Sequence, residues 1–443
     1  MKTKKLLSLG LAAAMALSMP LAVKAEDTNI LDVTLGEDYT DLKADLKFVT
    51  HRTDLVDTVF ADYIAQFQEM YPNINITYEG ITNYADDIMT RMSTGDWGDI
   101  GMIPTAIDKD ELPSYFEPFG EKEALEEKYT MLNNFTYEGV TYGLPSVGNA
   151  QGIVYNKKVF EEAGITELPK TPDEFLDALQ AIKDNTDAIP LYTNFAAGWT
   201  MSAWDAYIGG SATGDPDFMN TGMVHGDNPF AKKDDMTGPY AVYYVLYEAV
   251  ARGLTEDDPT TTDWEGSKGM INGGEIGTMV LGSWAVTQMQ EAGPNPDDIG
   301  YMTFPITVDG KQYATAGPDY NYGINVNSSD ENKLAAKLYI KFLMEESNFA
   351  FDQGGIPTVV GAEYPDIYSA FDGIELVVDN PALEGEENLY TEINNDSEIG
   401  LNVSPDDKSL IVEEAISGGM SLDDIMADWN ERWTSAQENA GVK

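Results

Sequence analysis

The chain has 443 residues and a formal net charge of −50, because 76 acidic side chains outnumber 26 basic ones. A surface this acidic repels phosphate groups, which excludes nucleic acid as a partner and disfavours docking on anionic membranes. Cysteine is absent, which excludes disulfides and thiolate chemistry, and two histidines are too few for a multi-histidine metal cluster. With 43% apolar residues, the composition is typical of a globular protein of two or three domains.

The first 25 residues have the pattern of an export signal. Lys2, Lys4 and Lys5 precede an apolar run at 6–17, and small or apolar residues lead up to Ala25. The run is shorter than the roughly 20 residues of a membrane-spanning helix. We therefore expect cleavage after residue 25 (signal peptide 1–25) and an exported protein, in a periplasm or on the outer face of the cell membrane, without a lipid-anchor cysteine.

The first part of the mature chain alternates between strand and helix patterns. Residues 26–44 are polar and lack periodicity, so we expect a flexible lead-in. The elements that follow are expected in this order: strand 46–50, helix 55–71, strand 74–78, helix 83–92 and strand 100–103. This order predicts an α/β fold with a parallel sheet, whose ligand crevice lies beyond the carboxyl ends of the strands.

The later chain repeats the alternation less regularly. Thr171, Pro172 and Glu174 have the spacing of a helix start with a capping box. Strands are expected at 276–281 and 299–304, a hairpin turn at Asp309-Gly310, and a helix over 334–343.

The sequence contains no phosphate-binding glycine loop, no His-Glu-x-x-His and no Gly-x-Ser-x-Gly motif, so we expect no metal and no cofactor. Tryptophan is more informative. Trp97, Trp199, Trp264 and Trp284 lie in Gly-, Asn-, Asp- or Thr-rich segments that are typical of loops. An indole stacks on the C–H face of a pyranose ring, while polar side chains bind the hydroxyls. Each Trp could instead fill core between domains; we expect at least two to face ligand.

His51 to Asp54 come directly after the first strand, at the crevice end of the predicted sheet. Arg52 is expected either to donate hydrogen bonds to a ligand or to form an ion pair with Asp54, which could also cap the next helix. His51 is expected to be structural.

Several segments together resemble one family. They are YGLPSVGNAQGIVYNKKVFEEAGITELPKTPDEFLDAL from Tyr142, TGDWGDIGMI from Thr94, GTMVLGSWAVTQM from Gly277, YGINVNSSDENKLAAKLYIKFLM from Tyr322 and EEAISGGMSLDDIMADWNERW from Glu413. In this order along 46–433, the chain resembles extracellular solute-binding proteins of carbohydrate ABC importers (family 1), the group that includes maltose-binding protein.

The resemblance implies a two-lobed, type II periplasmic-binding-protein-like α/β fold with a hinge of about three crossings. The crossings would fall near 147–150, 319–323 and 354–358. The N-terminal lobe would contain 45–148 plus 322–354, and the C-terminal lobe 149–321 plus 355–443.

The resemblance also implies contacts. Trp284, Trp199 and Trp204 match positions of aromatic residues near sugar in maltose-binding protein, and 51–54 matches a loop that bonds sugar hydroxyls there. Asp319 and Asn321, at a crossing, could supply a carboxylate and an amide to the cleft or serve the hinge alone. No Trp occurs at 401–408, where that relative stacks a further glucose, which argues against maltodextrin.

We therefore expect a monomeric binding protein, not an enzyme, that captures a sugar or oligosaccharide by hinge closure and delivers it to the transmembrane subunits of an ABC permease. Three alternatives remain at this point: a polyamine-binding or other small-solute protein of the same fold, a secreted glycoside-active enzyme, and a sensor or adhesin partner without transport.

Overall fold

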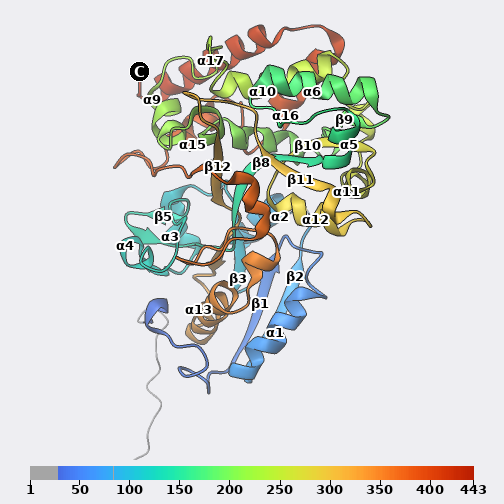
Figure 1. The fold of residues 1–443 in the computed structure, drawn as a ribbon. Helices are drawn as coiled ribbons and strands as arrows, with labels where there is room; N and C mark the ends of the chain where they lie inside the picture. Colours follow the sequence, from blue (N-terminus) through green and yellow to red (C-terminus); the bar gives the residue numbers. More distant parts are fainter. Residues whose placement is uncertain (1–27, 83) are drawn as a thin grey trace, which may run out of the picture.

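The computed structural model describes residues 28–82 and 84–443. The predicted signal peptide lies outside these residues and stays a prediction. Within the described ranges, no helix is both long and apolar enough to cross a bilayer. The chain forms two α/β lobes, one above the other in Figure 1, each built around its own sheet.

The first lobe, at the bottom of Figure 1, has a five-stranded sheet in the order β2-β1-β3-β13-β7. Strand β1 is parallel to β2 and β3, as the alternating pattern predicts, whereas β13 runs antiparallel to β3 and β7. The strands are β1 (Ala44–Thr50), β2 (Ile74–Gly80), β3 (Ile100–Ile103), β7 (Leu144–Pro145) and β13 (Asn321–Ile324). The helices of this part are α1 (Val59–Met70), α2 (Tyr84–Thr94), α13 (Asp330–Glu345) and α14 (Phe349–Asp352).

A small antiparallel sheet in the order β4-β6-β5 belongs to the first lobe, since Phe119 and Phe135 of this region lie in that lobe's core. Its elements are α3 (Leu112–Tyr115), β4 (Gly120–Glu121), α4 (Lys122–Leu125), β5 (Thr136–Tyr137) and β6 (Val140–Thr141).

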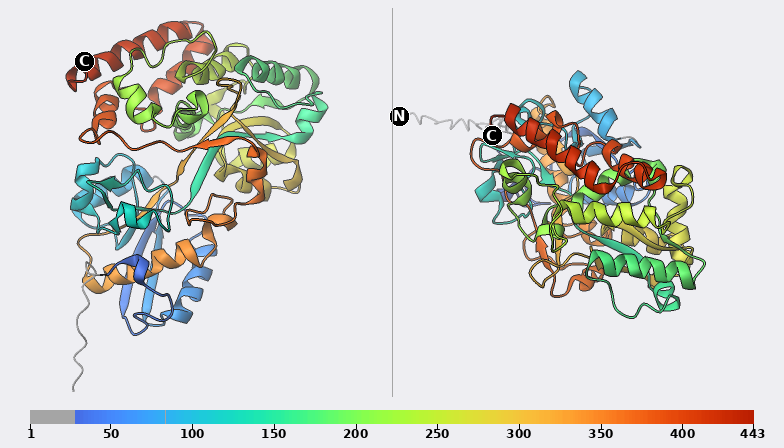
Figure 2. Two further views of the ribbon diagram at one scale, coloured as in Figure 1. Left: turned by 60° about the vertical axis from the view of Figure 1, so that its left-hand side comes forward. Right: turned by 90° about the horizontal axis from the view of Figure 1, so that it is seen from above.

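The second lobe is centred on the long strand β8, which pairs with β10 on one side and with β11 and β12 on the other. Its strands are β8 (Gly148–Asn156), β9 (Ile189–Leu191), β10 (Ile276–Gly282), β11 (Ile299–Thr303), β12 (Tyr313–Pro318) and β14 (Glu375–Val377). Its helices are α5 (Lys157–Glu162), α6 (Pro172–Asn185), α7 (Trp199–Ser202), α8 (Gly210–Thr213), α9 (Met223–His225), α10 (Pro239–Ala251), α11 (Trp264–Gly273), α12 (Trp284–Glu291), α15 (Leu389–Asp396), α16 (Asp406–Ser417) and α17 (Leu422–Asn439). Figure 2 shows α17 across the outer end of this lobe.

Successive strands change from the sheet of one lobe to the sheet of the other at three places. Strand β7 belongs to the first sheet and β8 to the second, and the same change separates β12 from β13. A third connection follows α14, where Ile356 pairs with Gly148 through hydrogen bonds of 2.7 and 2.8 Å. The chain therefore crosses between the lobes at points that lie close together. The residue limits of each lobe given above stay a prediction.

The segment before β1 differs from the predicted flexible lead-in. Its described part contains a short 3₁₀ turn, Ile30–Asp32, and it buries Ile30 and Val33 in the core of the first lobe. The Gly36 N–H donates to the Tyr71 hydroxyl at 3.1 Å. Two apolar side chains are enough to anchor such a segment, but they are too few to produce a periodic pattern in the sequence.

Local signals elsewhere are confirmed. Thr171 Oγ1 accepts the Glu174 N–H at 3.3 Å at the start of α6, and Glu174 reaches back to the Lys170 N–H at 2.8 Å. Asp309 and Gly310 both have positive φ, 49° and 79°, as a two-residue hairpin turn requires.

Candidate functional site

Three tryptophans from separate parts of the second lobe form one cluster. Trp199 begins α7, Trp264 begins α11 and Trp284 begins α12. Their ring centroids lie 5.1 Å apart for Trp199 and Trp264, 5.7 Å for Trp199 and Trp284, and 5.8 Å for Trp264 and Trp284. Each indole stands where a loop enters a helix, so the fold brings together three rings that are up to 85 positions apart in the sequence.

The three rings are not equally open. Trp199 is 43% exposed, an unusual amount for so apolar a side chain, whereas Trp264 and Trp284 are half-buried. The Lys268 ammonium lies 4.8 Å from the centroid of the Trp264 ring and occupies one of its faces. Trp199 is therefore the ring best placed to meet a flat apolar ligand surface.

The cluster adjoins the connection between lobes. Ser283, immediately before Trp284, accepts the Ala150 N–H at 3.1 Å and shares a 2.7 Å hydrogen bond with the Tyr368 hydroxyl. The Tyr368 hydroxyl in turn donates to the Gly354 carbonyl at 3.3 Å. In Figure 1, α11 and α12 lie on the side of the second lobe that faces the first.

On the first-lobe side, Arg52 forms an ion pair with Asp54. This is one of the two roles that the sequence predicted for Arg52. The Arg52 Nε and Nη2 donate to the two Asp54 oxygens at 2.9 and 2.7 Å, and Nη2 also donates to Gln353 Oε1 at 2.8 Å. Burial acts to raise the pKa of Asp54, but the hydrogen bonds and charge of Arg52 outweigh it and lower that pKa below its ordinary value. The three oxygens that accept from Arg52 belong to Asp54 and Gln353, so a ligand would have to share this guanidinium or replace one of them.

His51 is enclosed between aromatic rings. Its imidazole lies 4.5 Å from the centroid of Tyr320 and 6.0 Å from that of Tyr84. Burial lowers the pKa of His51, and the nearby Arg52 charge adds to this, while Asp319 and Asp54 oppose it. Its Nδ1 is buried without a hydrogen-bond partner. The structure therefore favours a neutral, packed histidine, as the sequence indicated.

A small cavity lies where these first-lobe residues meet the crossings. It has a volume of about 20 Å³, room for about one water molecule, and its polar lining includes Thr50, His51, Arg52, Ser146 and Asp319. The Asp319 N–H donates to the Val147 carbonyl at 2.8 Å, which joins two of the chain crossings. In this conformation a sugar ring cannot enter the cavity.

Three other predicted site residues have packing roles here. Trp97 is 1% exposed and lies against Gly101 of β3, where an added Cβ would come within 2.9 Å of the indole. Trp204 is 2% exposed and packs edge-on against Phe304. Asn321 is fully buried and donates to the Gly143 carbonyl at 3.2 Å. Their role as ligand contacts stays an untested prediction.

The segment 378–388, which we call the strap, connects the lobes in a way that the sequence did not indicate. It follows β14 of the second lobe, yet the Asp379 carbonyl accepts from Asn133 at 3.0 Å. Its Asn388 side chain accepts the Lys109 N–H at 3.1 Å and donates to Asp110 at 2.8 Å. Burial raises the pKa of Asp379 to about 6. No periodic pattern marks such a segment, because its contacts with the first lobe are polar and lie more than 240 positions away.

A groove of about 710 Å³ runs between the strap and the small antiparallel sheet. Its lining mixes charges of both signs, with Lys109, Lys122, Glu384 and Glu387, and has Tyr137 as its aromatic side chain. It lacks an indole, so we place the candidate site at the tryptophan cluster.

Comparison with known proteins decides the family. Residues 54–348 match the family model described as bacterial extracellular solute-binding protein. The chain belongs to this solute-binding protein family.

Solved relatives agree over nearly the whole chain. One is a manno-oligosaccharide-specific solute-binding protein from Bifidobacterium animalis subsp. lactis in complex with mannotriose. It is 48% identical, with a TM-score of 0.91 over 94% of this chain and 100% of that one. A second binding protein of an ABC transporter from the same organism, in complex with mannobiose, has the same identity, coverage and TM-score.

A multiple sugar-binding protein from Streptococcus mutans is 23% identical over 72% of this chain and 76% of its own length. The predicted family and the two-lobed type II fold are therefore confirmed. The relatives named above are described as binding proteins, not as enzymes.

Sequence reasoning missed two residues at the site. Gln353 holds Arg52 from 301 positions away, and Lys268 covers one face of Trp264. Lys268 stands one helical turn after Trp264, a spacing that could have indicated the contact. Nothing local could have indicated Gln353.

Proposed function

We propose that this solute-binding protein captures a manno-oligosaccharide between its lobes and delivers it to the permease of an ABC importer. The observation that carries the proposal is the cluster of Trp199, Trp264 and Trp284, half-open on the lobe that faces Arg52 and Asp54. The 48% identity to proteins solved with mannotriose and mannobiose supports the sugar class.

The chemistry of the two sides fits a sugar. Mannose and glucose rings both present C–H faces on which an indole can stack, and an arginine–carboxylate pair can donate and accept at neighbouring hydroxyls. A micromolar dissociation constant corresponds to about −8 kcal/mol, which a few stacked rings and charge-assisted hydrogen bonds can supply. The mannose preference would then be set by the polar side rather than by the rings.

Binding requires the lobes to move. The cavity beside Arg52 holds only about one water, so a sugar must enter a more open arrangement and then favour closure. A ligand that touches both lobes stabilises the closed arrangement through its differential affinity. The closed form is the state that a permease would select.

The remaining properties follow from this role. The protein acts outside the cytoplasm, as a monomer, without catalysis, cofactor or nucleic acid. Whether the natural compartment is a periplasm or the outer face of the membrane depends on the cell envelope. Size-exclusion chromatography with light scattering tests the monomer, and a stable dimer would contradict it.

Titration calorimetry with mannobiose, mannotriose, maltotriose and spermidine tests the function. We expect binding of the mannosides, weaker or no binding of maltotriose, and no binding of spermidine. Binding of spermidine alone would support the polyamine alternative instead. Chromatography of mannotriose after overnight incubation should recover it unchanged, whereas steady release of mannose or mannobiose would establish an enzyme.

A further inference from the structure

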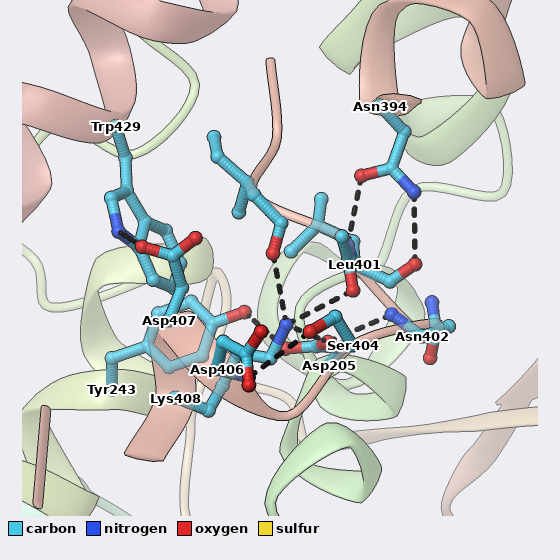
Figure 3. Close-up of polar contacts among 12 residues, drawn as sticks. Asp205, Tyr243, Asn394, Leu401, Asn402, Ser404, Asp406, Asp407, Lys408 and Trp429 are labelled. Atoms are coloured by element: carbon cyan, nitrogen blue, oxygen red, sulfur yellow. Dashed lines mark hydrogen bonds and ion pairs between the residues drawn. The ribbon is translucent and has the colours of Figure 1, made fainter. Parts of the chain in front are cut away.

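A fully buried ion pair joins two parts of the second lobe close to Trp199. Lys408 Nζ, on α16, lies 3.0 Å from Asp205 Oδ2, and neither side chain is exposed. Figure 3 shows the pair at the centre of a dense polar network. Asp205 belongs to the 3₁₀ segment Ala203–Tyr207, which continues directly from α7 and therefore from Trp199.

Both charged groups of the pair make further hydrogen bonds. Asp205 Oδ1 accepts from the Tyr243 hydroxyl at 2.7 Å, and Oδ2 accepts the Asn402 N–H at 2.8 Å. Lys408 Nζ donates to the carbonyl oxygens of Ile399 and Gly400 at 3.2 and 3.1 Å. The two side chains therefore bind the backbone of the loop at 399–405 at three of its first four residues, 399, 400 and 402.

This loop has a backbone that the chain does not adopt unaided. Glu398 and Asn402 have φ of 58° and 59°, an unfavourable region for residues with a side chain, and Gly400 has φ of 64°. Asn394 holds Leu401 through two further bonds: its Oδ1 accepts the Leu401 N–H at 2.8 Å, and its Nδ2 donates to the Leu401 carbonyl at 3.0 Å. Such a conformation persists because the surrounding bonds over-determine it.

The loop stands beside the candidate site. Pro405 Cγ lies 4.0 Å from where a Cβ on Gly198 would be, and Gly198 immediately precedes Trp199. Helix α16 contacts α7. At the tip of the loop, Val403 is 55% exposed. The ion pair therefore connects an exposed loop tip to the short helix that carries the most open indole.

A contribution to stability does not by itself explain why this ion pair is buried. Moving two charges out of water is costly, and apolar side chains of similar size often give equal or greater stability. We propose that Asp205 and Lys408 are positioning residues, which fix Trp199 and the loop at 399–405 as one rigid wall of the sugar site. This inference rests on the proposed function, because it assigns the wall to a sugar.

Three variants test the proposal. Lys408→Met removes one charge, and Asp205→Asn/Lys408→Met removes both, so the double variant leaves no uncompensated buried charge. Lys341→Met is the matched control, because Lys341 is 3% exposed and pairs with Glu345 at 2.8 Å in the first lobe. For each we would measure the melting temperature and the dissociation constant for mannotriose.

We expect Lys408→Met and Lys341→Met both to lower the melting temperature, but Lys408→Met alone to weaken mannotriose binding, by about tenfold or more. The double variant should recover much of the melting temperature and little of the affinity, because the donors to Ile399 and Gly400 are still missing. Recovery of affinity together with stability, or wild-type affinity in Lys408→Met, would overturn the proposal.

A readout without sugar separates this proposal from the proposed function. Acrylamide quenching is measured with and without Trp199→Phe, and the difference reports on Trp199 and its contacts with the two neighbouring indoles. In the double variant this difference should change relative to the wild-type background, because the wall is no longer fixed. An unchanged difference would overturn the positioning role. A wild-type protein that binds no sugar would overturn the proposed function but leave this measurement valid.

Discussion

The two sides of the candidate site are built from opposite kinds of residue. The second lobe presents three indoles at helix starts, held by ring contacts of 5.1 to 5.8 Å. The first lobe presents Arg52 and Asp54, held by hydrogen bonds of 2.7 to 2.9 Å, beside a packed His51. Stacking tolerates rotation of a sugar ring, whereas paired hydrogen bonds do not. The difference indicates that one side supplies affinity and the other supplies orientation.

The largest effect is expected on the apolar side. Trp284→Ala removes one of three indoles that all contact one another, and we expect mannotriose affinity to fall by about 30-fold, or 2 kcal/mol, as for the loss of an aromatic anchor. Calorimetry measures it. Trp433→Phe, fully buried in the same lobe, is the control and should lower stability without changing affinity. Wild-type affinity in Trp284→Ala would remove this residue from the site.

A smaller effect is expected on the polar side. Arg52→Ala should weaken mannotriose about five- to tenfold, roughly 1 kcal/mol, and should also reduce the preference for mannotriose over maltotriose. The control is Arg91→Ala, since Arg91 makes a comparable 2.7 Å surface ion pair with Glu79 away from the indoles. If Arg52→Ala weakens both sugars equally, this side does not supply orientation.

Within the cluster, the covered ring should matter less than the others. Because Lys268 occupies one face of Trp264, we expect Trp264→Phe to weaken mannotriose by only about two- to threefold. Trp284→Phe, measured in parallel by the same titration, should cost more. The reverse order would show that the face of Trp264 away from Lys268 is the main stacking surface.

The smallest effect concerns pH. Since burial lowers the pKa of His51 in the fold, the unfolded chain takes up a proton first, and stability falls as pH drops below about 6.5 until the folded-state pKa is reached. Urea unfolding of His51→Gln between pH 7.5 and 5 should show a flatter dependence of the unfolding free energy on pH than wild type. His225→Gln, at the other histidine, is the control. Parallel wild-type and His51→Gln curves would contradict the assignment.

Much of the fold could be predicted because its signals are local. The alternation that predicts β1, α1, β2, α2 and β3 depends on residues two to four apart, and so do the helix start at Thr171 and the turn at Asp309. The packed segment around Ile30 was missed because it has no period at all. The antiparallel β13 joins the first sheet from 218 positions beyond β3, a pairing that only the whole fold determines.

The site was predictable in part for the same reason. Loop-like surroundings singled out Trp199, Trp264 and Trp284 correctly as neighbours of loops, but the same surroundings also singled out Trp97, which the fold buries against Gly101. The composition of a loop does not determine on which side of a sheet the loop lies. The partners of Arg52 illustrate the limit, since Asp54 is two positions away and Gln353 is 301.

The strap restrains the separation of the two lobes. Because residues 378–388 leave one half and bond to Lys109, Asp110 and Asn133 of the other, any large rotation must stretch or break those three bonds. Asn380 meanwhile fastens the same segment to its own half, through Pro216 and Asn220. The equilibrium between open and closed conformations of the ligand-free protein therefore depends partly on this peptide segment.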